Sequence, residues 1–171
     1  PPYYDRRLIQ FFVNNGDGTF GDVTSTYNTN TKYANGLNNG YWNGDGQLHI
    51  IDFDADGDLD IVAALFMTSH VVWIENDGSP NNGGWTSHDV ISSSSSKESY
   101  DVTVGDIDGD GDLDIVEADQ TNKVYWYEND GSPGDGTWSM TKIKGGLTDA
   151  HVVAVADMDS DGDLDVISAA Y

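Results

Sequence analysis

Aspartates recur at a fixed spacing in three short stretches of the chain. These read DFDADGDLD at 52–60, DIDGDGDLD at 106–114 and DMDSDGDLD at 157–165. Carboxylates at positions 1, 3, 5 and 9 of such a loop repel one another unless a hard cation lies between them, and calcium prefers oxygen ligands. The glycine at position 6 supplies the sharp turn around the ion. The spacing therefore predicts three Ca²⁺ sites per chain.

Each acidic loop continues into a run of β-branched residues. The runs are Leu-Asp-Ile-Val at 59–62 and 113–116 and Leu-Asp-Val-Ile at 164–167. Such residues favour a strand over a helix. We therefore expect each metal to be held in a connection between two strands.

The acidic loops belong to a longer repeat. The first residues of the loops, Asp52, Asp106 and Asp157, are 54 and 51 residues apart, and a period of about 50 residues is typical of stacked supersecondary units. Each unit adds a second apolar strand (61–65, 115–118), a third (71–76, 124–129), an Asn-Asp-Gly turn and a fourth strand that begins at Trp85 or Trp138. Four short antiparallel strands per unit, with no helical stripe, predict an all-β fold, a β-propeller of four-stranded blades. A flat sheet or a sandwich is the alternative, which the regular period disfavours.

The two ends of the chain resemble complementary halves of one unit. Residues 7–20 match the third and fourth strands, with Phe11 at the position of Trp73, and residues 165–171 match the second strand. The expected organisation is a half-blade at 1–27, blades at 46–92 and 100–145, and a half-blade at 150–171. Closed propellers have about 4–8 blades, so we expect about three blades per chain and a six-bladed ring formed by a head-to-tail homodimer with shared terminal blades. The alternative is that these residues form part of a longer propeller.

The composition narrows the classes of partner. Thirty acidic and seven basic residues give a net charge of −23, which argues against nucleic acid and anionic membranes. No stretch is long and apolar enough for membrane insertion. The chain has no cysteine, and calcium loops of moderate affinity suit the millimolar calcium outside cells. We therefore expect an extracellular, secreted protein, although no signal peptide is visible.

The tripled loop, together with V-x-W-x-E-N-D-G at 71–78 and Asn-Gly-Asp-Gly-Thr-Phe at 15–20, resembles the FG-GAP/VCBS repeats of integrin-α-like propellers. Among proteins built only of such blades, the chain is most similar to the mushroom lectins of this fold, which are carried on longer chains. The resemblance implies calcium-binding blades and a carbohydrate-binding protein, a lectin whose partners are glycans. It implies that positions 1, 3, 5 and 9 give side-chain ligands and position 7 a backbone carbonyl. The implied metal residues are Asp52, Asp54, Asp56, Asp58, Asp60, Asp106, Asp108, Asp110, Asp112, Asp114, Asp157, Asp159, Asp161, Asp163 and Asp165.

Sugar recognition needs an apolar face for stacking and polar groups that bond to hydroxyls. In a blade of this topology the calcium loops lie on one face of the ring, so polar, aromatic connections on the opposite face are the candidates. These residues are Tyr41, Trp42, Asn43, Tyr100 and His151. Local packing is the competing interpretation for Trp42, Tyr100 and His151. The recurring Trp73, Trp85, Trp126 and Trp138 are expected in the core between blades.

No catalytic motif stands out, so we expect a binding protein and not an enzyme. There is no G-x-S-x-G, phosphate loop or zinc-spaced histidine pair. The enzymatic alternative is a polysaccharide lyase, for which Arg6, Arg7, Tyr100 and His151 carry suitable chemistry. A third possibility is an adhesion module that binds a protein. His49, His70 and His88 receive no role, and Glu75, Glu98, Glu117 and Glu128 are glutamates outside the acidic loops.

Overall fold

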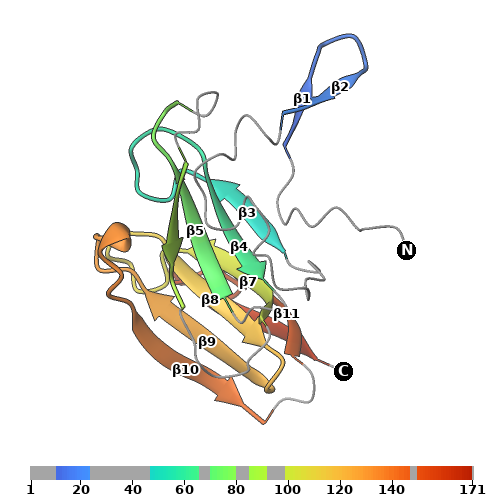
Figure 1. Cartoon of the computed structure of the whole chain (residues 1–171). Helices are drawn as coiled ribbons and strands as arrows, with labels where there is room; N and C mark the ends of the chain where they lie inside the picture. Colours follow the sequence, from blue (N-terminus) through green and yellow to red (C-terminus); the bar gives the residue numbers. More distant parts are fainter. Residues whose placement is uncertain are drawn as a thin grey trace.

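The computed structural model describes residues 11–23, 47–65, 70–79, 85–91, 99–146 and 150–170. This part of the chain is all β (Figure 1), apart from one three-residue 3₁₀ turn, η3, at Pro133–Asp135. No helix within it has the length and apolarity needed to cross a membrane. Its strands form two four-stranded and two two-stranded antiparallel sheets, which confirms the predicted fold of four-stranded blades.

The first complete sheet is an antiparallel meander in the order β3-β4-β5-β6. Its strands are β3 (Leu48–Ile51), β4 (Asp60–Leu65), β5 (His70–Asn76) and β6 (Trp85–Asp89). All six residues of β4 are buried. A strand packed on both faces must be apolar at successive positions, which explains the run Ile61–Leu65.

The second complete sheet repeats this arrangement. It consists of β7 (Ser99–Gly105), β8 (Asp114–Asp119), β9 (Lys123–Glu128) and β10 (Ser139–Gly145). The registers correspond as well, because Val62 lies opposite Trp73 in the first sheet and Val116 lies opposite Trp126 in the second. The repeat read in the sequence is therefore a repeat of strand pairing.

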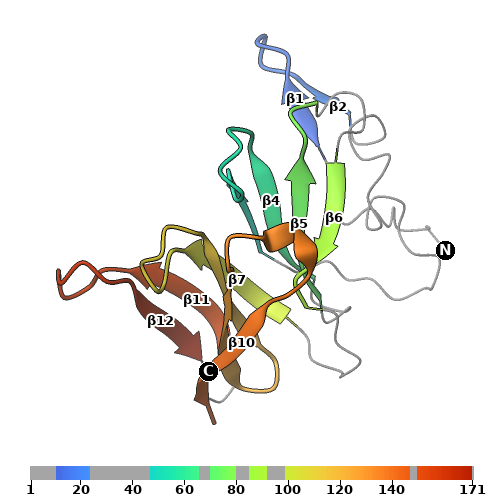
Figure 2. The same ribbon diagram turned by 90° about the vertical axis from the view of Figure 1, so that its left-hand side faces the viewer.

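Two hairpins lie at opposite ends of this pair of sheets (Figure 2). One is β1 (Phe12–Asn14) with β2 (Phe20–Asp22), and the other is β11 (Ala150–Ala156) with β12 (Asp165–Ala170). The β1–β2 hairpin adjoins the first sheet through Phe11, whose ring centroid lies 5.3 Å from that of Trp85. The β11–β12 hairpin packs on the second sheet through Val153, Val155 and Val166. The two complete blades and the two hairpins thus follow one another along an arc.

The core lies between blades. The largest cluster joins Val62, Val71 and Trp73 of the first sheet to Ile115 and Tyr127 of the second. Phe53 lies between the tryptophans of two blades, with ring centroids 5.6 Å from Trp73 and 6.1 Å from Trp138. The recurring tryptophans contribute to this inter-blade packing, as predicted: Trp73 and Trp85 are buried, and Trp126 and Trp138 pack against core clusters.

Candidate functional site

Each acidic loop connects the first and second strands of its blade. The loops lie between β3 and β4, between β7 and β8, and between β11 and β12. In all three, the amide N–H of the glycine at position 6 donates to an Oδ2 of the aspartate at position 1, at 3.1 Å. The amide at position 7 donates to the carboxylate at position 5, at 2.8–3.0 Å. These bonds turn the carboxylates toward the inside of the loop.

Two residues in each loop have a left-handed backbone. At position 6 the glycines Gly57, Gly111 and Gly162 have φ of 98–102°, which confirms the predicted turn. Position 4 is also left-handed, with φ of 61° at Ala55, 76° at Gly109 and 64° at Ser160. Only the second loop has glycine at this position, so the residue types do not indicate the left-handed backbone of the other two loops.

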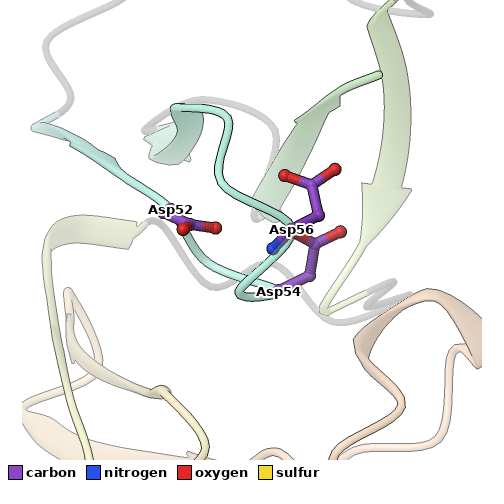
Figure 3. Close-up of side chains that lie close together, drawn as sticks. All are labelled: Asp52, Asp54 and Asp56. Atoms are coloured by element: carbon purple, nitrogen blue, oxygen red, sulfur yellow. The ribbon is translucent and has the colours of Figure 1, made fainter. Parts of the chain in front are cut away.

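The carboxylates converge. Oxygens of Asp52, Asp54 and Asp56 lie within 4.8 Å of one another (Figure 3), and so do oxygens of three aspartates in each of the other loops. Asp52 Oδ2 accepts the Gly57 amide, but Oδ1 is buried without a hydrogen-bond partner. A buried carboxylate oxygen without a partner is costly, and a cation among these oxygens would satisfy it. The residues therefore fit a hard divalent ion.

The electrostatics of the first loop favour a positive charge. Burial raises the pKa of Asp54, and the negative charges of Asp60, Asp56 and Glu75 raise it further. Like charges this close disfavour ionisation, so the loop bears an electrostatic cost that a bound cation would relieve. The remaining clusters are Asp106, Asp108 and Asp110 in the second loop and Asp157, Asp159 and Asp165 in the third.

The aspartates at position 9 have a further role in the first two loops. Asp60 is fully buried, and its carboxylate accepts the amides of Phe53 (3.2 Å) and Asn76 (2.8 Å) and Trp73 Nε1 (3.0 Å). Asp114 is likewise buried and accepts the equivalent amides of Ile107 and Asn129. Burial raises the pKa of both carboxyls despite these donors. Position 9 thus anchors the loop to the third strand of its blade.

The Asn-Asp-Gly turn packs against the acidic loop. Asn76 Nδ2 donates to the Leu59 carbonyl, and Asn129 Nδ2 to that of Leu113. At Gly78, which has φ of 77°, an added Cβ would lie 2.6 Å from Asp58 Oδ2. The same contact at Gly131 is with Asp112, at 2.8 Å. The side chains at position 7 therefore lie against these glycines, which explains why the turn repeats together with the loop.

A hollow of about 320 Å³ lies between the two complete blades, beside the first acidic cluster. The first blade contributes Asp54, Trp73 and Glu75, and the turn between β9 and β10 contributes the segment 132–135. The lining combines three carboxylates with a hydroxyl, a proline and a tryptophan. Such a surface can accept several hydrogen bonds from hydroxyl groups.

His88 contacts two of the residues that line this hollow, Trp73 and Glu75. Its ring stacks on Trp73, with centroids 4.4 Å apart and an interplanar angle of 21°, and its Nε2 lies 2.7 Å from Glu75 Oε2. A Cβ at Gly134 of the next blade would lie 3.5 Å from the His88 ring and 3.8 Å from the Trp73 ring, at ordinary van der Waals distance. The sequence assigned no role to His88, because its partners come from the neighbouring strand β5 and from the turn at Gly134 in the next blade. The cross-strand position of His88 opposite Trp73 was the only signal.

The predicted sugar residues are only partly within the described structure. Tyr41, Trp42 and Asn43 lie outside the described residues. Tyr100 and His151 stack on each other, with ring centroids 4.1 Å apart and an interplanar angle of 19°. His151 also lines a second hollow, of about 380 Å³, with Val152, Ala169 and Ala170. The structure therefore places two of the five candidates, Tyr100 and His151, in contact with each other.

Other polar residues join strands and blades. The buried Glu117 accepts hydrogen bonds from Ser99 Oγ and from the Tyr127 hydroxyl (2.6 Å). His49 Nε2 lies 2.8 Å from the Val102 carbonyl of the next blade. Arg6, Arg7 and Glu98 lie outside the described residues, and so does the side chain of His70.

Comparisons with known proteins agree with this architecture. A family described as FG-GAP-like repeat matches residues 52–117 and 114–168. No curated protein matches the chain. Among solved structures, a lectin of Agrocybe aegerita is similar, with a TM-score of 0.55 and 23% sequence identity over 93% of this chain. That lectin is described as recognising non-reducing terminal N-acetylglucosamine, and the present chain spans 40% of its length.

Proposed function

Because this chain belongs to the FG-GAP-like repeat family, we propose that it is a calcium-stabilised carbohydrate-binding protein, a lectin without catalytic turnover. The observation that carries the proposal is the hollow between the two complete blades. The propeller fold shared with a lectin that recognises N-acetylglucosamine supports carbohydrate as the ligand class. We infer a secreted protein, because loops with moderate affinity for calcium are occupied where the calcium concentration is millimolar, as it is outside cells.

Calcium would be held by the three clusters. The residues that would hold it are Asp52, Asp54 and Asp56 in the first loop, Asp106, Asp108 and Asp110 in the second, and Asp157, Asp159 and Asp165 in the third. The ion supplies the positive charge that lets these carboxylates stay ionised side by side. Asp54 belongs both to its cluster and to the lining of the hollow. Calcium binding and sugar binding are therefore coupled at this residue.

The residues of the hollow would bind a sugar by its hydroxyl groups. Glu75 and Asp135 are acceptors on opposite blades, and Ser132 can donate or accept. The Asp135 carboxylate is held in place by the amide and hydroxyl of Thr137, at 2.8 and 2.5 Å. His88 fixes Glu75 from the side. Acceptors held in this way lose little conformational freedom when a ligand binds.

A second candidate position is the Tyr100–His151 stack beside the hollow lined by His151. The sequence predicts sugar binding on this face of the ring, opposite the acidic loops. The two positions are distinguishable because they share no residue. Substitution of Tyr100 and His151 by alanine tests the stack, whereas substitution of Glu75 and Asp135 tests the hollow between the blades.

The decisive experiment is a glycan array with and without calcium, followed by calorimetry on the ligands found. Glu75→Gln and Asp135→Asn are expected to weaken binding by roughly 10-fold or more, because each loses a charge-assisted hydrogen bond. Asp130→Asn is the matched control, since Asp130 is exposed on the same turn and outside the lining. Release of shortened oligosaccharides would instead indicate a lyase. A silent array in both buffers would contradict the lectin and favour an adhesion module.

A further inference from the structure

The hollow between the two complete blades is acidic on both of its sides. Asp54 and Glu75 come from the first blade and Asp135 from the second, and the described residues that line it include no lysine or arginine. Figure 2 shows the turn that carries η3, in orange, next to β5 and β6. A ligand that enters this hollow therefore meets carboxylates from two directions.

The positive side chains of the described structure lie elsewhere. Its lysines are Lys123 at the start of β9 and Lys142 and Lys144 in the second half of β10. Lys123 lies opposite Gly145 in this pair of strands, whereas the lining segment 132–135 belongs to the turn at the other end of the pair. Within the described ranges, no lysine therefore offsets the charge of the hollow.

Glu75 and Asp135 are the carboxylates available to a ligand, since Asp54 belongs to the first calcium cluster. Glu75 Oε2 lies 2.7 Å from His88 Nε2. Asp135 Oδ1 accepts both the amide and the hydroxyl of Thr137, and these bonds lower the pKa of Asp135. Among the bonds seen in the described structure, the second oxygen of each carboxylate has no partner. One fixed negative charge thus comes from each blade.

These two carboxylates do not form a further metal cluster. In each calcium loop, oxygens of three aspartates lie within 4.8 Å of one another, but among the described residues no such group includes Glu75 or Asp135. A cation that interacts with both blades must therefore belong to a larger ligand. The hollow, of about 320 Å³, is at the small end of the range for ligand pockets, which suits a single sugar ring.

We propose, on the basis of the carbohydrate binding proposed above, that this hollow selects an amino sugar whose nitrogen is a free ammonium group, such as glucosamine. The ammonium group donates charge-assisted hydrogen bonds to Glu75 and Asp135. Trp73 and Pro133 supply the apolar part of the lining. N-acetylation removes the charge and adds a carbonyl oxygen, a further acceptor among carboxylates that can only accept. The unacetylated sugar is therefore the preferred ligand.

The first test is calorimetry on the full chain in saturating calcium at about 0.15 M salt, with glucosamine and N-acetylglucosamine as matched ligands. At about pH 7 we expect glucosamine to bind roughly 10-fold more tightly, because charge-assisted hydrogen bonds are about twice as strong as neutral ones. The preference should disappear at about pH 9.5, since an amine of this kind loses its proton at about pH 8. Equal affinities for the two sugars at the lower pH would overturn the proposal.

The second test separates the hollow from the overall charge of the protein. Glu75→Gln and Asp135→Asn are expected to weaken glucosamine binding roughly 10-fold more than N-acetylglucosamine binding, since each removes a negative charge that only the ammonium group uses. Asp130→Asn removes the same charge from the same turn, outside the lining, and should leave the ratio of the two affinities unchanged. An equal effect of all three variants would show a general attraction of cations and would overturn the proposal.

The ring of the ligand has its own control. The compound 2-aminoethanol has the ammonium group and one hydroxyl but no ring, so it should bind much more weakly than glucosamine. Binding of equal strength would show that charge alone is recognised, against the proposal.

The outcomes also separate this selectivity from the proposed function. If neutral sugars bind in the hollow and glucosamine gains nothing over them, the lectin stands and the selection of an amine is wrong. If no sugar binds, charged or neutral, the proposed function fails and the selectivity fails with it.

Discussion

At the residue scale, the fourth position of each acidic loop has a left-handed backbone in all three copies. Glycine adopts this conformation without the steric cost that a Cβ imposes. The second loop has Gly109, but the first and third have Ala55 and Ser160. The repeat therefore tolerates backbone strain at two of three equivalent positions. The second loop, with Gly109, shows the same backbone without this strain.

We expect Ala55→Gly to stabilise the protein by about 1 kcal/mol, since it removes the cost of a left-handed alanine. The reverse change, Gly109→Ala, should destabilise it by a similar amount. Urea denaturation in saturating calcium measures both. Ala63→Gly, in the middle of β4, is the control and should be destabilising. Stabilisation by Gly109→Ala would contradict the strain argument.

Asp60 is the second residue whose contribution to stability can be measured. Its replacement by alanine would leave the Phe53 and Asn76 amides and Trp73 Nε1 without an acceptor. Since each unsatisfied buried donor costs about 1–3 kcal/mol, Asp60→Ala should lower the free energy of unfolding by at least ~3 kcal/mol.

The matched variant for this comparison is Asp77→Ala. Asp77 is exposed and accepts only a local bond from the Ser79 amide among the bonds seen for its side chain. Its loss should change the free energy of unfolding by less than about 0.5 kcal/mol. Equal effects of the two substitutions, measured by urea denaturation with the calcium affinity determined in parallel, would argue against the anchoring role of Asp60.

At the scale of elements, adjacent blades are joined by polar contacts as well as by apolar packing. His49 on β3 reaches the Val102 carbonyl on β7, and the carboxylate of Asp101 on β7 accepts the Val153 amide on β11 at 2.9 Å. Asp101 is 6% exposed, and burial raises its pKa, although the Val153 and Val102 amides and His49 act in the opposite direction. These contacts fix the offset of one sheet relative to the next.

The raised pKa of Asp101 makes blade docking depend on pH. Since the folded state holds the proton more tightly than the unfolded state, the contribution of Asp101 to stability falls as pH rises from its usual pKa of 3.8 through the raised value. Asp101→Asn keeps an acceptor for the Val153 amide and removes the titration. The free energy of unfolding, measured against pH in constant saturating calcium, should therefore decline less steeply in the variant. Parallel curves for wild type and variant would show that Asp101 does not titrate in this range.

At the scale of the whole molecule, the chain is an arc of blades with an acidic loop at one end of each hairpin of first and second strands (Figure 1). The net charge of −23 is concentrated in these loops, which contain half of the acidic residues. Without counter-charge, each loop holds several carboxylates at close range next to the inter-blade core. The stability of the arc should therefore depend on bound cations.

Removal of calcium by EDTA is expected to lower Tm by roughly 10 °C or more. Three sites occupied at about 100 times Kd contribute ~2.7 kcal/mol each, and each kcal/mol moves Tm by about 2–4 °C in a domain of this size. Calorimetry before and after chelation measures the shift. Readdition of calcium should restore Tm, whereas magnesium should not, because it keeps its water and needs a more regular geometry. An unchanged melting curve would exclude a structural role for the ion.

Local features of this protein were readable from its sequence, because they depend on neighbours within a few residues. The spacing of the aspartates, Gly57 and its equivalents, and the β-branched run after each loop specify a turn between two strands, and the tripled pattern specifies blades. Phe11 and Phe20 could be aligned with the strands of later blades for the same reason.

Only the tertiary structure decided which groups meet between blades. Asp54, Glu75 and Asp135 come from two blades, and their distance in the chain carries no sign that they line one hollow. The contact from Asp101 to Val153 also follows from the offset of neighbouring sheets. That offset is set by side-chain packing across the inter-blade core, which a periodic pattern of strands does not specify.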